Sequence, residues 1–295
     1  MCPSEVKEQL SLKTKRFELY APSKKELKKA KEELEYAVKK FKFYLGEYPP
    51  KIVTILFNNS EEMKGYDFNR FTKRKLQVLN FFIPNALRAA DMEISRKIPA
   101  WKKKPDKKNR HPLSHEAGHM FLRAYCNNNF AKLSRRKQRQ SRSISKLLLP
   151  AWFNEAVATL CEFPSLQKER YAVMKKYMKE IIPLRKFFTL VHPAAKIMKK
   201  KRKPKIIHSN KTSTFFVLDK AFNTLISVFY AQALTFTHFL AEKEGPKFIG
   251  KMAKEFLKGK NINEILRQAE SVSSNFSKLE ATWLKWLGSR LTNVE

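Results

Sequence analysis

Two histidines four residues apart, His115 and His119, are the residues of this chain best placed to do chemistry. They lie in HPLSHEAGHMFLRAY, with Glu116 directly after the first. On a helix, residues i and i+4 are roughly 5–6 Å apart at Cβ, so both imidazoles can bind one metal ion at about 2.0–2.1 Å. Glu116 lies about 100° further round the helix, too far for the natural third ligand but near enough to take a proton from water on the metal. The H-E-x-x-H pattern predicts a zinc site with Glu116 as general base; two solvated histidines on a helix surface are the alternative.

The third ligand does not follow from the local pattern. A metzincin-type site needs a further His within about ten residues, but the next histidine after His119 is His192, and no Gly stands at the required place. SprT-like nucleic-acid-associated proteases also need a nearby third His. A carboxylate from a later helix is left, and the candidates are Glu155, Glu162 and Glu169.

The segment LPAWFNEAVATLCE, which contains Glu155, resembles the W-[FL]-x-E-G-x-A…E segment of gluzincins, the relatives of thermolysin and aminopeptidase N. The resemblance is closest to bacterial peptidase MA-like families, and it covers most of the chain from about Arg16. It includes a strand–long helix–strand opening, a helix pair in FYAQALTFTHFLAEKEGPKFIGKMAKEFLKG, and a closing helix in LEATWLKWL. The resemblance implies a zincin-like catalytic domain whose third zinc ligand is Glu155.

The chain departs from the gluzincin pattern at three places. Ala156 stands where the family has Gly, and Thr159 stands where thermolysin has an Asp that supports a ligand histidine. The connection from His119 to Glu155 is longer than in aminopeptidase N. No ligand is lost, but the support of the ligand histidines is left open. DMEI (residues 91–94) lacks the Gly and Asn of the amine-binding segment of aminopeptidase N, which favours an endopeptidase.

The uncharged run FNTLISVFYAQALTFTHFLA, from Phe222, is long enough for a membrane span. Its polar residues favour a buried helix instead, and hence no transmembrane segment. Wound at 100° per residue, it has a polar stripe that is expected to line a cleft: Asn223, Ser227, Tyr230, Leu234, Thr237 and His238. In gluzincins a Tyr from a C-terminal helix donates a hydrogen bond to the oxyanion, and the resemblance makes Tyr230 the candidate, with His238 as rival. A Tyr packed on the core with a locally bonded hydroxyl is the structural alternative.

The elements that position these residues follow from periodicity and caps. A strand in RFELYAPS leads into a long helix with capping-box residues Ser23 and Glu26, which ends at Gly46. KIVTILFNN and LQVLNFFIP predict two further strands. The His-Glu helix is expected over about 112–125, and the residues after Pro150 read as helices.

A strand-rich first part and a helical second part predict an α+β fold. Residues 1–15 are expected to form an N-terminal tail. Residues 16–130 form an N-terminal α+β lobe with a small mixed sheet and the HEAGH helix. Residues 131–295 form a helical C-terminal lobe that carries the third ligand, and the two lobes make one catalytic unit.

The formal net charge of +34 over 295 residues sets this chain apart from an ordinary globular protein. Three runs are especially basic: WKKKPDKKNR, KLSRRKQRQSRSISK and KIMKKKRKPK. Such a surface is expected to attract nucleic acid, an anionic membrane surface or acidic peptides at low salt. A general basic bias that keeps the protein soluble is the alternative explanation.

The remaining reactive residues suggest little chemistry. Cys2, Cys126 and Cys161 lack disulfide or CxxC spacing and are expected to be thiols in a reducing compartment. The lack of an apolar signal favours the cytoplasm, whereas Cys2 directly after Met1 would also suit an exported lipoprotein trimmed to its lipidated cysteine. His111, His192 and His208 lie beside Pro or Lys in expected loops and receive no role.

These residues together predict a zinc metallopeptidase that acts on a peptide or protein substrate. One Zn2+ ion is held by His115, His119 and Glu155, Glu116 is the general base, and Tyr230 stabilises the oxyanion. One alternative is a nucleic-acid or anionic-surface binding protein with a structural or vestigial zinc site. Another is a metallohydrolase that acts on a non-peptide amide. The oligomeric state is not indicated.

Overall fold

A four-stranded mixed sheet forms one end of the molecule, with strand order β1-β2-β3-β4. The computed structural model describes residues 9–58, 62–63, 66–74, 76–82, 113–131, 149–193, 205–209, 214–217 and 220–292. The strands of this sheet are β1 (Leu10–Lys13), β2 (Phe17–Ala21), β3 (Ile52–Phe57) and β4 (Gln77–Phe82). β1 pairs antiparallel with β2, while β2, β3 and β4 are parallel. The short helix α3 (Asn69–Thr72) precedes β4. The predicted strands around β2, β3 and β4 are therefore confirmed.

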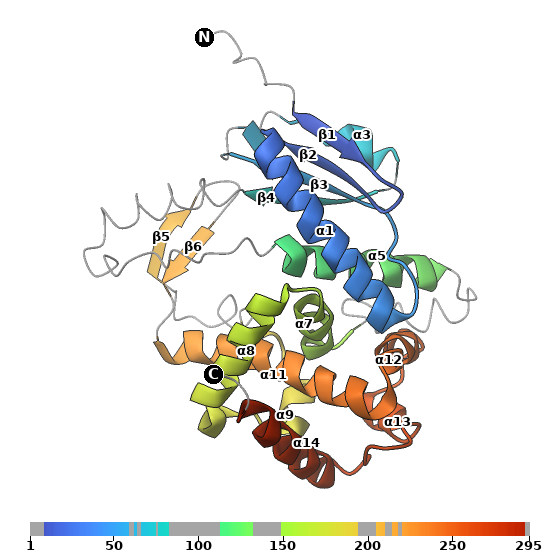
Figure 1. Ribbon diagram of the computed structural model, residues 1–295, viewed down its shortest axis with the longest axis vertical. Helices are drawn as coiled ribbons and strands as arrows, with labels where there is room; N and C mark the ends of the chain where they lie inside the picture. The colour runs from blue at the N-terminus through green and yellow to red at the C-terminus, as the bar shows by residue number, and fades with distance from the viewer. Residues whose placement is uncertain are drawn as a thin grey trace.

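The helix α1 (Lys24–Leu45) crosses the sheet and extends beyond it toward the other helices (Figure 1). Its start is fixed by the Ser23 side chain, which accepts a hydrogen bond from the Glu26 N–H at 3.2 Å. Its end is fixed by Gly46, whose φ of 81° is a conformation that other residues rarely adopt. Both predicted boundaries of this helix are confirmed.

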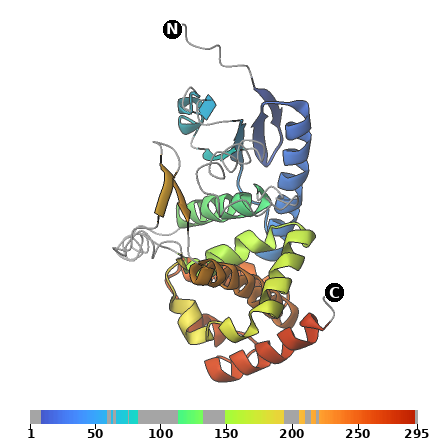
Figure 2. The same ribbon diagram turned by 90° about the vertical axis from the view of Figure 1, so that its left-hand side faces the viewer.

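The second part of the chain is mainly helical and packs below the helix α5 (Leu113–Ala131), which lies between it and the sheet (Figures 1 and 2). The further helices are α7 (Ala151–Leu160), α8 (Pro164–Lys176), the 3-10 turn η2 (Met178–Glu180), α9 (Leu184–Thr189), α11 (Lys220–Glu244), α12 (Phe248–Leu257), α13 (Ile262–Leu266) and α14 (Phe276–Leu291). The chain is thus a mixed helix and sheet protein, in agreement with the α+β prediction at this coarse level.

Two features correct the sequence-based outline. β1 lies within residues 1–15, which the outline treats as a tail, because pairing with β2 orders four mostly exposed residues that show no buried periodicity. A second, two-stranded antiparallel sheet of β5 (Lys205–Ser209) and β6 (Thr214–Val217) lies in the part expected to be helical. The three basic runs, except for Lys205, lie outside the described residues, as do DMEI, Cys2 and His111.

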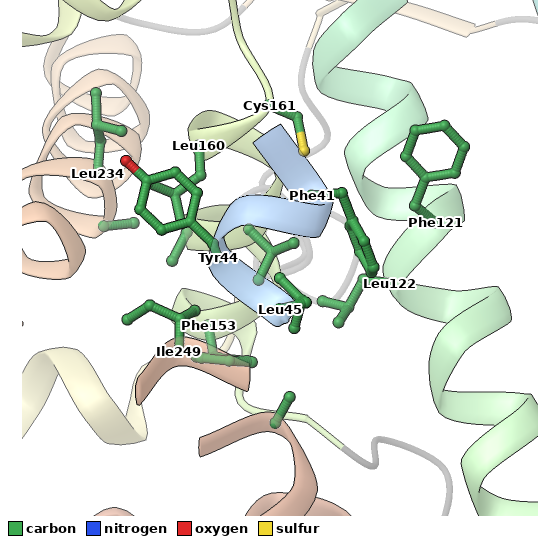
Figure 3. Close-up of a cluster of buried hydrophobic side chains, with 14 of the residues drawn as sticks. Phe41, Tyr44, Leu45, Phe121, Leu122, Phe153, Leu160, Cys161, Leu234 and Ile249 are labelled. Carbon is green, nitrogen blue, oxygen red and sulfur yellow. The ribbon is translucent and has the colours of Figure 1, made fainter. Parts of the chain in front are cut away.

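The two lobes share one hydrophobic core. Figure 3 shows the C-terminal part of α1 among side chains of four other helices: Phe121 and Leu122 of α5, Phe153 and Leu160 of α7, Leu234 of α11 and Ile249 of α12. The Phe41 ring lies 5.8 Å from the Phe121 ring, in an edge-on arrangement. The N-terminal and C-terminal lobes are therefore joined by packing around the end of α1.

The helix α11, which contains the uncharged run from Phe222, is buried over most of its length from Asn223 onward. By length and composition, residues Asn223–Glu244 could cross a membrane, but 61% of the apolar window is buried inside the protein. Gln232 is fully buried and is bonded to the backbone of Ile182 through both ends of its amide. This burial is the one expected for a core helix.

The helices α5 and α7 approach each other at Gly118, the glycine inside the HEAGH motif. A Cβ atom at Gly118 would lie 2.7 Å from Ala158 Cα and 3.2 Å from Cys161 Cβ. Because the Ala158 Cα atom is part of the α7 backbone, only a movement of that helix could relieve this contact. The glycine therefore allows α7 to lie directly against α5.

We predict that Gly118→Ala lowers the free energy of unfolding by about 1–3 kcal/mol, because the added methyl group pushes α7 away. Gly288→Ala in α14 is the matched control, since nothing lies within 4 Å of its Cβ position; it should stabilise the protein by about 0.5–1 kcal/mol. Urea denaturation of both variants measures the difference. Equal stability of the two variants would show that the helices are not in close contact at Gly118.

A buried carboxylate, Glu18, links β2 to the residues that precede β3 and β4. The Glu18 side chain is fully buried and binds Arg74 at 2.9 Å and Lys51 at 2.9 Å. The Arg74 guanidinium, with Lys51, lowers the pKa of Glu18 from 4.5 to about 2, although burial opposes this shift. Folding therefore gains stability from the ionised carboxylate above pH 4.5 and loses it as the pH falls toward 2.

We predict that Glu18→Gln lowers the free energy of unfolding by about 3 kcal/mol at pH 7, and that this gap closes near pH 2. The exposed pair of Glu35 with Lys31 on α1 provides the control, since Glu35→Gln should change stability by less than about 0.5 kcal/mol at either pH. Denaturant titrations of the native protein and both variants measure the gap. A gap for Glu18→Gln that is the same at pH 7 and near pH 2 would contradict this assignment.

Candidate metal centre

Three side chains converge where α5 meets α7. His115 and His119 lie one turn apart on α5, and their Nε2 atoms are 3.1 Å from each other. The Glu155 Oε2 atom of α7 lies 3.5 Å from each of these nitrogens. The site thus contains two imidazoles and one carboxylate, contributed by the two helices that touch at Gly118.

The geometry of these three atoms fits a metal ion. Ligands held tetrahedrally at about 2.0–2.1 Å from zinc are separated by about 3.3 Å from one another, which agrees with the spacings of 3.1 and 3.5 Å. Glu155 Oε2 is buried and accepts no hydrogen bond from the residues that the structure describes, although a buried carboxylate oxygen without a hydrogen bond is costly. His115, His119 and Glu155 could therefore hold a metal ion.

The orientation of His115 is fixed by a carboxylate behind it. Its Nδ1 atom lies 2.8 Å from Glu162 Oε1. Because an ionised carboxylate only accepts hydrogen bonds, Nδ1 carries the proton and Nε2 faces the site. Arg170 binds both oxygens of Glu162, at 2.7 and 3.2 Å. Glu162, one of the three carboxylates considered as third ligand, therefore supports His115 instead of joining the cluster.

His119 is supported by Asn154, the residue directly before Glu155. Its Nδ1 atom lies 3.2 Å from Asn154 Oδ1, so Nδ1 donates and Nε2 again faces the site. Thr159 does not take part, because its hydroxyl donates to the backbone carbonyls of Glu155 and Ala156 within α7. The two site histidines are therefore held by Glu162 and Asn154 rather than by Thr159.

The charges around the site favour a protonated His115 beside an ionised Glu155. Burial alone lowers the pKa of His115, but the carboxylates of Glu155 and Glu162 outweigh it and raise that pKa to about 9. Burial alone raises the pKa of Glu155, but the imidazoles of His115, His119 and His192 hold it well below its usual range. A metal ion that binds here at neutral pH must displace a proton from His115.

Glu116 and Tyr230 lie beside the three candidate ligands. Glu116 is half-buried on α5 and forms no hydrogen bond or ion pair with the described residues, so its carboxylate can accept a proton. The Tyr230 ring of α11 lies 5.7 Å from the His115 ring. Burial raises the pKa of Tyr230, and the charges of Glu155 and Glu116 raise it further. Its hydroxyl therefore stays protonated and can donate a hydrogen bond.

His192, which the sequence analysis leaves without a role, is part of the site. Its Nε2 atom lies 3.2 Å from Glu155 Oε1 and 3.2 Å from the Tyr230 hydroxyl. It comes from the segment after α9, more than thirty residues from either partner in sequence. The only local signal for it was that histidine is rare in this chain, which has six.

The other candidates lie away from the centre. His238 is bonded through Nδ1 to the Tyr171 hydroxyl at 2.9 Å, about 12 Å along α11 from Tyr230. Burial lowers the pKa of His238 to about 4. Glu169 is exposed on α8 and Cys126 is buried in the core. Within the polar stripe on α11, Tyr230 contacts His192 and the His115 ring, whereas Leu234 and Thr237 are buried.

Comparison with known proteins adds no relative: no family model, no curated protein and no solved structure matches this chain. The resemblance to gluzincins therefore rests on the motif residues, and the case for a metal rests on the geometry of the site.

We predict that Glu162→Gln weakens zinc binding by about 10- to 100-fold, because the neutral amide holds His115 less firmly and no longer neutralises Arg170. Glu169→Gln, on the exposed face of α8, is the control and should bind zinc like the native protein. Competition with a chelating dye measures both affinities. If Glu162→Gln binds zinc as tightly as Glu169→Gln, Glu162 does not support the metal site.

Proposed function

We propose that this protein is a zinc-dependent peptidase of gluzincin type, with a zincin-like catalytic domain, and that it acts as an endopeptidase. The observation that carries the proposal is the convergence of His115, His119 and Glu155 Oε2, which accepts no hydrogen bond from the described residues, on one point. Three protein ligands leave a fourth position for water, as in catalytic rather than structural zinc sites. Structural sites usually have four protein ligands, and the described residues provide three.

The residues around the ligands have separate tasks in peptide hydrolysis. A zinc ion, when bound, makes a water molecule more acidic and polarises the scissile carbonyl. Glu116 accepts a proton from the attacking water and later delivers it to the leaving amine. The Tyr230 hydroxyl donates a hydrogen bond to the carbonyl oxygen as negative charge develops there. Glu162 and Asn154 keep His115 and His119 in the required tautomers.

The positive charge supports a narrower choice of partner. A chain with a net charge of +34 attracts anionic molecules over several ångströms, and salt weakens this attraction. An acidic peptide or protein is therefore the proposed substrate class. The second candidate function is binding of nucleic acid or an anionic surface, which the same charge favours.

We predict that Glu116→Gln abolishes hydrolysis of a casein-like substrate while zinc content stays at one ion per chain, because the amide cannot take up the proton. Zinc content by metal analysis and release of peptides are measured on the same preparations. Glu169→Gln serves again as a control with full activity.

Three outcomes of this experiment separate the candidates. Hydrolysis by the native protein and not by Glu116→Gln supports the peptidase. Salt-dependent binding of nucleic acid, without hydrolysis by either protein, supports the binding protein. Equal hydrolysis by both proteins would remove Glu116 from the mechanism, and a screen of non-peptide amides tests for a different hydrolase.

A further inference from the structure

His192 lies where it can act on both the third candidate ligand and the candidate oxyanion donor. Its Nε2 atom is 3.2 Å from Glu155 Oε1 and 3.2 Å from the Tyr230 hydroxyl. Phe229 packs edge-on against the imidazole, with ring centres 5.6 Å apart. One nitrogen on a packed ring thus lies beside two groups of the proposed mechanism.

The neighbours of this nitrogen determine which atom carries the proton. A glutamate side chain is ionised at neutral pH, so Glu155 Oε1 can only accept a hydrogen bond. A bare nitrogen 3.2 Å from that oxygen would set a lone pair against a negative charge. Nε2 of His192 therefore carries a hydrogen and donates it to Glu155 Oε1.

This proton assignment also determines how Tyr230 can be oriented. A nitrogen that carries hydrogen has no lone pair to offer, so the Tyr230 hydroxyl cannot donate to His192. The hydroxyl oxygen can instead share the Nε2–H as an acceptor, which leaves its own proton to point elsewhere. That proton is the one needed for the carbonyl oxygen of a substrate.

The two oxygens of Glu155 are thereby made different. Oε1 is occupied by His192, whereas Oε2 lies between the ligand histidines and has no hydrogen bond. A carboxylate held in this way presents one oxygen to a metal ion. Without the donor at Oε1, the carboxylate could turn and present both oxygens, which would fill the position that water needs.

We propose that His192 is a positioning residue that limits Glu155 to one metal-facing oxygen and directs the Tyr230 proton into the site. This inference rests on the proposed function, because it assigns a role within the same metal centre. It assigns no contact between His192 and the metal or the substrate. It has two consequences. A bound metal ion should be four-coordinate, and the Tyr230 hydroxyl proton should point toward the substrate.

Cobalt(II) is the probe for the first consequence, because its visible absorption is strong in four-coordinate sites and weaker in five-coordinate ones. The test uses the full chain, loaded with Co2+ in place of zinc, as native protein, His192→Phe and His192→Gln. Phe keeps an aromatic ring next to Phe229 but has no donor, whereas the Gln amide keeps an N–H at about the same distance along the side chain. Val191→Ala, next to His192 and half-exposed, is the matched control.

We expect the native protein, His192→Gln and Val191→Ala to share a four-coordinate spectrum. His192→Phe should show weaker, five-coordinate absorption and bind Co2+ with an affinity changed by about 10-fold or more, as for other residues that orient a ligand. Identical spectra and affinities for all four proteins would overturn the proposal. Circular dichroism melting curves show whether each variant folds. If His192→Phe does not fold, the His192→Gln variant provides the test. Because Gln keeps an N–H donor, a five-coordinate spectrum for His192→Gln would overturn the proposal.

The second consequence is tested by kinetics at saturating zinc. His192→Phe should lower kcat and leave KM nearly unchanged, and the same substitution should lower kcat much less when Tyr230→Phe is already present, because the effect acts through that hydroxyl. Equal losses in both backgrounds would overturn the link to Tyr230. If the native protein hydrolyses no peptide, the proposed function fails, but the cobalt spectra still decide the role of His192. If the native protein binds no Co2+, both proposals fail.

Discussion

The site depends on how closely α5 and α7 approach each other. The two histidines come from α5 and the carboxylate comes from α7, so the distance between these helices sets the distance between the ligands. At Gly118 that distance is so short that even a methyl group would meet the backbone of α7. Gly118 lies between His115 and His119, so the glycine that permits the contact belongs to the same turn as the two imidazoles. The HEAGH sequence therefore combines chemistry and packing within five residues.

The end of α7 explains why Glu162, and not Thr159, supports His115. That helix ends at Leu160, and Glu162 follows just beyond its end, where a side chain can turn back toward α5. Thr159 is directed into its own helix backbone and could not do the same. A buried Glu162 needs a compensating charge, and Arg170 from α8 provides it with two hydrogen bonds. Glu162 rather than Thr159 thus supports His115, and α8 contributes to the site through Arg170.

Much of this arrangement could be predicted because it depends on residues that are close together in the sequence. The period of α1, its Ser23 cap and its Gly46 end are each determined by neighbouring residues. The same holds for the two histidines one turn apart, and for the apolar β-branched residues of β3. The segment around Glu155 could be recognised because its pattern is also local.

The parts that could not be predicted depend on distant contacts. β1 is ordered by pairing with β2, and its four residues show no buried period of their own. His192 meets Glu155 and Tyr230 across gaps of 37 and 38 residues, which no local spacing encodes. The choice between Tyr230 and His238 was open because both lie on one stripe of α11. Only the position along the axis separates them, and that position relative to α5 is a property of the folded chain.

The protonation of the site indicates why a metal ion suits it better than hydrogen bonds alone. Without metal, the raised pKa of His115 means that its Nε2 carries a proton at neutral pH. That proton faces two acceptors, His119 Nε2 at 3.1 Å and Glu155 Oε2 at 3.5 Å, and one hydrogen cannot satisfy both. Glu155 Oε2 remains without a hydrogen bond in a buried place. A cation placed among the three atoms would accept a lone pair from each of them at once. One ion could therefore bind His115 Nε2, His119 Nε2 and Glu155 Oε2 together, which one proton cannot do.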